Sequence, residues 1–186
     1  MKYTIKSGME IELRPLRHSD SESLAVYFQQ LSEKTRSRFA PHPFDEATAQ
    51  FICEHLSLPQ IIIIAAYPPG TIVGYTILQE GWMPGDKERY YQYGVPVNGS
   101  GIWSMAPSVA DSWQGKGIGP AMFQYALKYL QWFEAEKLVL WGGVQSDNIP
   151  AVKFYQHLGF EPKGSFYYNG KENMDMILSL KYNHYL

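Results

Sequence analysis

The sequence predicts a mixed α/β fold, α+β in organisation, formed by residues 1–186 as a single domain. Short segments alternate apolar with polar residues or consist of β-branched runs, and both patterns are typical of strands. Longer segments repeat apolar residues at helical spacing. The chain has 186 residues, of which 45% are hydrophobic, so it can bury one core. We find no repeat, linker or low-complexity tract that would divide it.

The N-terminal half carries signals for strands and helices in alternation. Apolar and charged residues alternate over residues 9–14, which predicts a half-buried strand that Pro15 ends. Ser19 and Asp20 can cap a first helix. Its apolar face comprises Leu24, Tyr27, Phe28 and Leu31. The remaining predicted elements are a connecting loop over residues 34–44, a helix over residues 45–55, and a hairpin whose strands, 61–67 and 72–78, flank Pro68, Pro69 and Gly70.

A glycine-rich turn organises the C-terminal half. A predicted strand over residues 102–110 precedes it, and Pro107 should interrupt the ladder of that strand at an edge or a bulge. A predicted helix over residues 121–134 follows, with Pro120 in its first turn. The turn itself consists of Gln114, Gly115, Lys116, Gly117, Ile118 and Gly119.

The chemistry of this turn indicates a pyrophosphate site. Glycines allow positive φ and a close approach of the backbone to a ligand, while the first N–H groups of a helix have no intrahelical partner and lie at the positive end of its dipole. The alternative is a tight turn with no ligand. A mononucleotide P-loop is excluded because Lys116 is followed by Gly117 rather than by Ser or Thr. The dinucleotide fingerprint does not fit the spacing from Gly117 to Gly119 either.

A second motif follows at residues 148–160. Asp147 or Asn148 can cap a helix, Pro150 suits its first turn, and Gly159 can close its C-terminus. The two motifs, Gln114-x-x-Gly117-x-Gly119 and Asn148-x-x-Ala151-x-x-Phe154-Tyr155-x-x-Leu158-Gly159-Phe160, together resemble the two central motifs of the GNAT family of acyl-CoA-dependent N-acetyltransferases. Their order and separation also match that family.

The resemblance implies a fold and a cosubstrate. The fold would be a mixed, mostly antiparallel central sheet of about seven strands, splayed at its central strands, with helices on both faces. The cosubstrate would be acetyl-CoA. Its pyrophosphate would lie on the turn from Gln114 to Gly119, and its pantetheine arm would pair with the backbone around Ser108 and Val109. The two remaining elements are a strand over residues 137–144, splayed from the central strand, and a final hairpin over residues 160–180 around Asn169 and Gly170.

The resemblance also implies the transfer chemistry. A neutral amine would attack the thioester carbonyl, a backbone N–H near Val109 would stabilise the oxyanion, and the Tyr155 phenol would meet the departing sulfur. Full proton donation from a phenol of pKa about 10 to a thiolate of pKa about 8.5 is uphill by about 2 kcal/mol, so hydrogen bonding alone can suffice. Tyr155 as a core aromatic residue is the alternative. Asn148 can orient the cofactor or a water, or it can simply cap the helix.

No general base is evident. A lysine-like amine of pKa about 10.4 loses its proton at a cost near 4.6 kcal/mol at pH 7, whereas an α-amine of pKa about 7.7 costs only about 1 kcal/mol. We therefore favour an acceptor amine of low pKa, or a water relayed to Ser104 or Asp111. By the same resemblance, Phe39 or His42 is a candidate to touch the acceptor.

Residues 82–101 allow two interpretations. Tyr90, Tyr91 and Tyr93 lie among four glycines. We favour a long surface hairpin, since tyrosines at alternate positions suit one face of a strand. The alternative is an aromatic flap over the acceptor site. Aromatics here can line an acceptor cleft or a homodimer contact, and the sequence does not separate the two.

Composition limits the partners. The formal net charge of −2 gives no electrostatic reason for a nucleic-acid or anionic-membrane partner. Cys53 is the only cysteine, which excludes an intrachain disulfide and a cysteine zinc cluster, and no paired-histidine spacing predicts another metal site. The N-terminus lacks the apolar segment of a signal peptide, and the apolar run 61–66 is too short to span a bilayer. We expect a cytoplasmic protein.

Three functional hypotheses therefore stand. The first is an N-acetyltransferase that transfers an acetyl group from acetyl-CoA to a primary amine of a small molecule or protein by direct attack. The second is a catalytically silent acyl-CoA-binding sensor or regulatory module. The third is an unrelated nucleotide-binding protein, for which ATP or NAD would have to compete with CoA. The sequence leaves the acceptor, the acyl-chain preference and the oligomeric state open.

Overall fold

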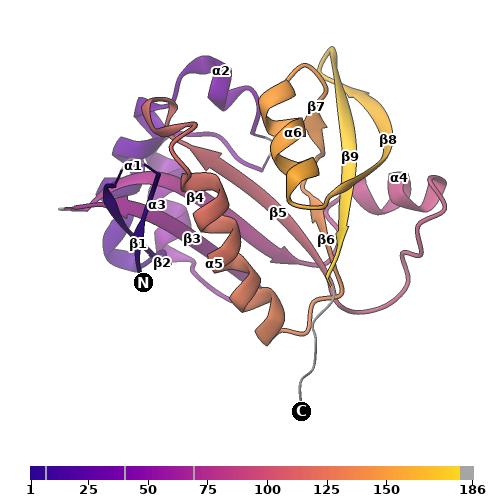
Figure 1. Ribbon diagram of the computed structural model, residues 1–186, viewed down its shortest axis with the longest axis horizontal. Helices are drawn as coiled ribbons and strands as arrows, with labels where there is room; N and C mark the ends of the chain where they lie inside the picture. The colour runs from indigo at the N-terminus through magenta and orange to yellow at the C-terminus, as the bar shows by residue number, and fades with distance from the viewer. Residues whose placement is uncertain (7, 40, 69, 181–186) are drawn as a thin grey trace. The chain divides into compact units, whose positions relative to one another are not determined.

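A computed structural model describes residues 1–186 with the exception of residues 7, 40, 69 and 181–186 (Figure 1). The chain forms two compact units. The first comprises Met1–Gln79 and Ala106–Tyr129, and the second comprises Glu80–Met105 and the chain from Leu130 onward. Strand β5 (Ile102–Val109) and helix α5 (Ile118–Trp132) each contribute residues to both units. The expected single domain stays a prediction, and each unit is described by itself.

An antiparallel sheet forms the first unit. Its strands are β1 (Lys2–Thr4), β2 (Glu10–Pro15), β3 (Gln60–Tyr67) and β4 (Thr71–Glu80), which pair in that order. The predicted hairpin is confirmed, because β3 and β4 pair antiparallel through contacts such as Ile62 opposite Ile77. Beyond the end of β5, the Ala110 N–H donates to the Val73 carbonyl at 3.0 Å. The β-branched run of β3 is buried, as a strand covered on both faces requires.

Helices cover both faces of this sheet, as two adjacent residues of β4 demonstrate. Successive strand residues point to opposite faces. A Cβ added at Gly74 would lie 2.5 Å from the Met122 sulfur of α5, so α5 packs closely on one face. On the other face, the Tyr75 ring contacts the rings of Tyr27 and Phe28. Both belong to helix α1 (Ser21–Gln30), which lies on the side of the sheet away from α5 (Figure 1).

Between β2 and β3, the structure confirms one prediction from the sequence and corrects two. Asp45 accepts from the Thr48 N–H at 2.7 Å and caps α3 (Glu46–Glu54), so the second predicted helix is confirmed. The predicted loop, however, contains the short helix α2 (Glu33–Arg36). Asp20 does not cap α1 through its side chain. It lies in a short helical turn, η1 (His18–Asp20), where its carboxylate binds the Arg14 guanidinium at 2.6 and 2.8 Å.

The second unit contains the other half of the β structure. The bounds are β6 (Lys137–Leu140), β7 (Val144–Gln145), β8 (Glu161–Tyr168) and β9 (Lys171–Ser179). The first four residues of β5 pair parallel with β6, while β9 pairs antiparallel with β6, β7 and β8. Asn169 and Gly170 have φ of 48° and 71°, which is the conformation that Asn-Gly favours in a two-residue hairpin turn. The final hairpin is confirmed.

The predicted strand over residues 137–144 is broken in the middle. Gly142 and Gly143 have φ of 69° and 68°, which a strand does not accommodate, so β6 ends at Leu140 and β7 begins at Val144. A Cβ at Gly143 would also lie 2.7 Å from the Met174 carbonyl oxygen. The close approach of β9 therefore requires glycine there.

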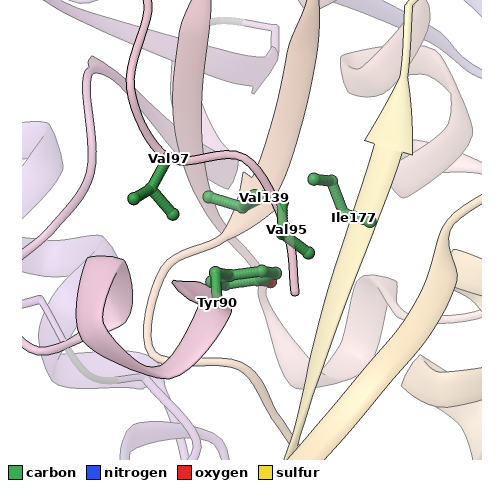
Figure 2. Close-up of a cluster of buried hydrophobic side chains, with 5 residues drawn as sticks. All are labelled: Tyr90, Val95, Val97, Val139 and Ile177. Carbon is green, nitrogen blue, oxygen red and sulfur yellow. The ribbon is translucent and has the colours of Figure 1, made fainter. Parts of the chain in front are cut away.

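The predicted hairpin over residues 82–101 is wrong, because the segment contains helix α4 (Asp86–Gln92). Gly85 precedes the helix with φ of 81°. Tyr90 is fully buried among Val95, Val97, Val139 and Ile177 (Figure 2), and its hydroxyl donates to the Met176 carbonyl at 2.8 Å. Tyr91, its neighbour, is 69% exposed. Tyr90 and Tyr91 thus lie on different faces of a helix, and Tyr90 is buried both by Val95 and Val97 of the same segment and by Val139 and Ile177 of distant strands.

Candidate active site

The glycine-rich turn joins a strand to a helix, as the sequence predicted. Strand β5 leads through a helical turn, η2 (Asp111–Trp113), into the turn and then into α5. Gly115 and Gly117 have φ of 74° and 93°, so both adopt the left-handed conformation that favours glycine. Helix α5 begins at Ile118, three residues earlier than expected, and Gly119 and Pro120 lie in its first turn.

This geometry leaves backbone donors at the start of α5. The Ala121 N–H donates to the Gly117 carbonyl at 3.2 Å, so the N–H groups of Ile118 and Gly119 lie before the ladder of the helix itself. Ile118 is 1% exposed, which fixes this end of the helix on the sheet. With the dipole of a 15-residue helix behind them, these donors favour an anion.

The Gln114 side chain is used inside the protein. Its amide donates to the Val109 carbonyl at 3.1 Å and to the Thr35 hydroxyl at 3.4 Å. The side chain therefore ties the end of β5 to α2, and its NH2 group is not available to donate to a ligand. The motif glutamine thus shapes the turn.

Asp111, a candidate to receive a proton through a water, makes structural hydrogen bonds instead. Its carboxylate accepts from the Ser32 N–H at 2.9 Å, from the Ser32 hydroxyl at 2.7 Å and from the Thr35 hydroxyl at 2.7 Å. Burial acts to raise the pKa of Asp111, but these hydrogen bonds outweigh it and lower the pKa. Asp111 thus anchors the start of α2. Ser104, the other such candidate, is fully buried and donates to the Gly81 carbonyl.

Strand β5 pairs with β6 only as far as Met105. The ladder with β6 ends at Met105 opposite Leu140, and Pro107 lies two residues further along a strand that continues to Val109. This end of the ladder agrees with the interruption that Pro107 predicted, because proline has no N–H to donate. Ser108 is buried, and its hydroxyl is hydrogen-bonded to the Tyr27 hydroxyl at 2.8 Å. Val109 is half-buried and accepts the Gln114 bond.

Lys116 lies beside an aromatic pair. Its ammonium group is 5.2 Å from the centre of the Trp113 ring, and that ring is 5.0 Å from the Tyr67 ring. A cation–π contact of this kind positions the charge at the turn without neutralising it.

His42 belongs to an aromatic cluster with Phe28, Phe39, Phe44 and Tyr75. The Pro43 carbonyl can only accept, so His42 Nδ1 donates to it at 2.7 Å, and Nε2 accepts from the Tyr75 hydroxyl at 3.0 Å. Burial lowers the pKa of His42, against the opposing effect of the Pro43 bond, and the ring is held in its neutral form. A substrate contact of Phe39 or His42 stays a prediction.

Tyr155 and Asn148 belong to the second unit, whereas the residues from Ser108 to Gly119 belong to the first. Helix α6 (Ile149–His157) carries Tyr155, which is 8% exposed and packs its ring against those of Phe154 and Phe160. Within the described residues, no group hydrogen-bonds the Tyr155 hydroxyl, and burial raises the pKa of this phenol. Asn148 precedes α6, but its side chain makes no capping hydrogen bond to the helix.

Two searches of the described residues concern other site classes. Residues 1–180, apart from positions 7, 40 and 69, contain no group of three or more His, Cys, Asp or Glu side chains arranged to hold a metal ion. No helix in that part of the chain has both the length and the apolar character to cross a membrane.

Comparison with known proteins identifies the family. The model of the acetyltransferase (GNAT) family matches residues 25–160. A spermine/spermidine N(1)-acetyltransferase of Bacillus subtilis is 24% identical over 112 residues, which span 60% of this chain and 66% of that protein. The L-amino acid N-acetyltransferase AaaT of Escherichia coli is 22% identical over 157 residues, 84% of this chain and 86% of that protein.

Solved structures agree on the fold. The GNAT domain of S. lividans PAT superposes with a TM-score of 0.77 at 17% identity, and the match covers 97% of this chain and 96% of that one. Because the family model spans most of the sequence and the mixed, largely antiparallel architecture is that of this family, the chain belongs to the acetyltransferase (GNAT) family and is an acyltransferase enzyme.

Proposed function

We propose that this enzyme transfers the acetyl group of acetyl-CoA to a primary amine of a small molecule or protein. The proposal rests on the geometry of the glycine turn that connects β5 to α5. Two left-handed glycines lead into a helix whose first N–H groups lie outside its own ladder, and a pyrophosphate matches both the donors and the dipole. The proposed cofactor-binding residues are Ser108, Val109, Gln114, Gly115, Lys116, Gly117, Ile118, Gly119 and Asn148.

The backbone of β5 supports the second part of the binding site. Its ladder with β6 ends at Met105, so the strand from Ala106 to Val109 has backbone groups that this ladder does not use. An amide-rich pantetheine arm can pair with such groups in the manner of an added strand. In the proposed transfer, the amine attacks the thioester carbonyl, and a backbone N–H near Val109 donates to the oxygen that becomes negative.

Tyr155 is the proposed partner of the departing thiolate. Its hydroxyl has no hydrogen-bond partner among the described residues, so this donor is not committed to the fold. Burial raises the pKa of the phenol, which keeps it protonated at neutral pH and makes complete proton transfer to the thiolate more unfavourable. We therefore propose that the C–N bond forms as the C–S bond breaks, that Tyr155 donates a hydrogen bond to the departing thiolate and keeps its own proton, and that the proton lost by the attacking nitrogen passes to solvent.

The acceptor is proposed to be an amine that is partly neutral at pH 7. Asp111 and Ser104, the two side chains considered for a relay, are engaged in structural hydrogen bonds. Without a base, an α-amine of pKa about 7.7 loses its proton far more readily than one of pKa about 10.4. The names of the two curated relatives refer to small amines, spermine or spermidine and L-amino acids, and support a small-molecule acceptor. A cytoplasmic location and a homodimer stay predictions.

Calorimetric titration with acetyl-CoA tests the proposal, beside Gly117→Glu, which places bulk and negative charge at the turn. The matched control is Gly94→Glu, because Gly94 also has a left-handed φ, 75°, with open space around it. We expect acetyl-CoA to bind the wild type and the control, and binding to be lost in Gly117→Glu. A folded wild-type protein that does not bind acetyl-CoA would contradict the cofactor assignment.

An amine screen then separates catalysis from mere binding. Spermidine, L-amino acids and peptides with free α-amines are incubated with acetyl-CoA, and the release of free CoA is followed. Release above the amine-free rate supports the transferase. Binding of acetyl-CoA without any release would favour the silent acyl-CoA-binding module.

A further inference from the structure

We propose that Lys6 binds the pyrophosphate of acetyl-CoA, a role that rests on the proposed function. Lys6 lies in the connection between β1 and β2, far from the glycine motif in the sequence but next to it in the first unit. A Cβ built at Gly117 would lie 3.4 Å from Lys6 Cγ, 3.6 Å from its backbone nitrogen and 3.9 Å from Cδ. The stem of Lys6 therefore packs on the glycine whose left-handed conformation opens the turn.

The connection that carries Lys6 is fixed on both sides. The Ile5 side chain is 3% exposed, which anchors the preceding residue in the core. The Ile5 N–H donates to the Met9 carbonyl at 3.0 Å, and the Gly8 N–H donates to the Ile5 carbonyl at 2.9 Å. These bonds close the connection between the strands, so the position of the Lys6 stem at Gly117 is set by the sheet.

The ammonium group of Lys6 is not committed to a carboxylate within the described residues. Lys2, in the preceding strand β1, contrasts with it because its ammonium lies 3.8 Å from the Glu10 carboxylate. Asp111 is the only acidic residue between positions 106 and 129, and its carboxylate is occupied by Ser32 and Thr35. Lys6 and Lys116 thus bring two positive charges to the turn, and neither ammonium forms an ion pair within the part of the chain that the structure describes.

A pyrophosphate diester matches this arrangement better than a neutral ligand does. It carries two negative charges on its phosphate oxygens. The N–H groups of Ile118 and Gly119 can donate hydrogen bonds to these oxygens, and a lysine adds a positive point charge. From Cδ, which lies 3.9 Å from the position that a Cβ would take at Gly117, the Lys6 ammonium reaches about 2.5 Å further, because two bonds remain in the side chain. Lys6 can therefore approach a phosphate that lies over the turn without any change of the backbone.

The test compares Lys6→Met with Lys2→Met. Methionine keeps most of the apolar stem over Gly117 and removes only the charge. Calorimetry with acetyl-CoA at low ionic strength should show that Lys6→Met raises Kd about tenfold, which is the scale of one charge-assisted phosphate contact. Lys2→Met should leave Kd unchanged, and Lys6→Arg should retain most of the affinity. The effect of Lys6→Met should shrink as salt is added, because the lysine is exposed.

Titrations with CoA and with 3′-dephospho-CoA identify the phosphate involved. Lys6→Met should weaken both ligands by the same factor, since both contain the pyrophosphate. A penalty for CoA alone would assign Lys6 to the 3′-phosphate and overturn the proposal, and so would wild-type affinity in Lys6→Met. If the folded wild type binds no acetyl-CoA, both the proposed function and the role of Lys6 are refuted. If the wild type binds acetyl-CoA and Lys6→Met binds it equally well, only the role of Lys6 is refuted.

Discussion

Replacing Tyr155 by phenylalanine separates the role of its hydroxyl from the role of its ring. The ring packs against Phe154 and Phe160, and phenylalanine retains both contacts. The hydroxyl has no hydrogen-bond partner among the described residues, so its removal takes no bond from the fold. The hydroxyl oxygen is also not one of the inaccessible polar atoms that lack a partner, so its removal relieves no buried unsatisfied group. We therefore expect the free energy of unfolding of Tyr155→Phe to be close to that of the wild type.

The rate, in contrast to the stability, should fall. A hydrogen bond to the departing thiolate is charge-assisted and contributes about 1.5–3 kcal/mol, which corresponds to a loss of about ten- to a hundredfold in kcat. Measurable turnover should remain, because a phenol with a raised pKa stabilises the thiolate mainly by hydrogen bonding and not by full proton transfer. The assay follows CoA release at saturating acetyl-CoA and amine, and urea unfolding measures stability.

Tyr90→Phe is the matched control in the same unit. Its hydroxyl is buried and donates to the Met176 carbonyl at 2.8 Å, so its loss should lower the free energy of unfolding by about 1–3 kcal/mol. We expect no comparable loss of kcat at a temperature where the variant is folded. An unchanged kcat in Tyr155→Phe would refute the proposed contact with sulfur, and destabilisation by more than about 1 kcal/mol would instead show that the hydroxyl supports the fold.

Two further predictions concern buried charge. Arg89 binds Asp175 at 2.7 Å and Asp86 at 2.7 Å, and both carboxylates are nearly inaccessible, so Arg89→Met should lower the free energy of unfolding by about 3–5 kcal/mol. Lys163→Met, which breaks an exposed pair with Glu161 of similar length, should change the free energy of unfolding far less than Arg89→Met does in urea unfolding, and equal effects of the two variants would refute this prediction. Burial lowers the pKa of His42 in the folded state below its unfolded value near 6.5, so the unfolded chain binds more protons and stability should fall as pH decreases below about 6.5. Thermal unfolding of His42→Gln between pH 7.5 and 5 should show a weaker pH dependence than the wild type, and an identical slope would exclude His42 as its source.

The sequence determined the elements that depend on local chemistry. Asn169 and Gly170 fix the last hairpin because both adopt positive φ readily. The glycine turn before α5 was predicted for the same reason, and Asp45 caps α3 through a bond to Thr48, three residues away. In each case the residues that decide the structure are neighbours along the chain. The motif pair that identifies the family also consists of such short segments.

Tertiary structure decided the elements whose partners are distant in the sequence. The Tyr90 ring is buried in part by Val139 and Ile177, which are distant in the sequence, and the alternation of the tyrosines gave no sign of these contacts. Residue 143 must be glycine because the Met174 carbonyl of β9 lies beside it.

The same distinction holds at the candidate site. The sequence supplied the turn, with its glycines and its helix start, but not the residues that surround it. Asp111 anchors α2 through Ser32, and Lys6 packs on Gly117, although neither partner is adjacent in the chain. A turn can be predicted from the conformations that its own residues allow, whereas a contact between segments exists only after the sheet has brought them together.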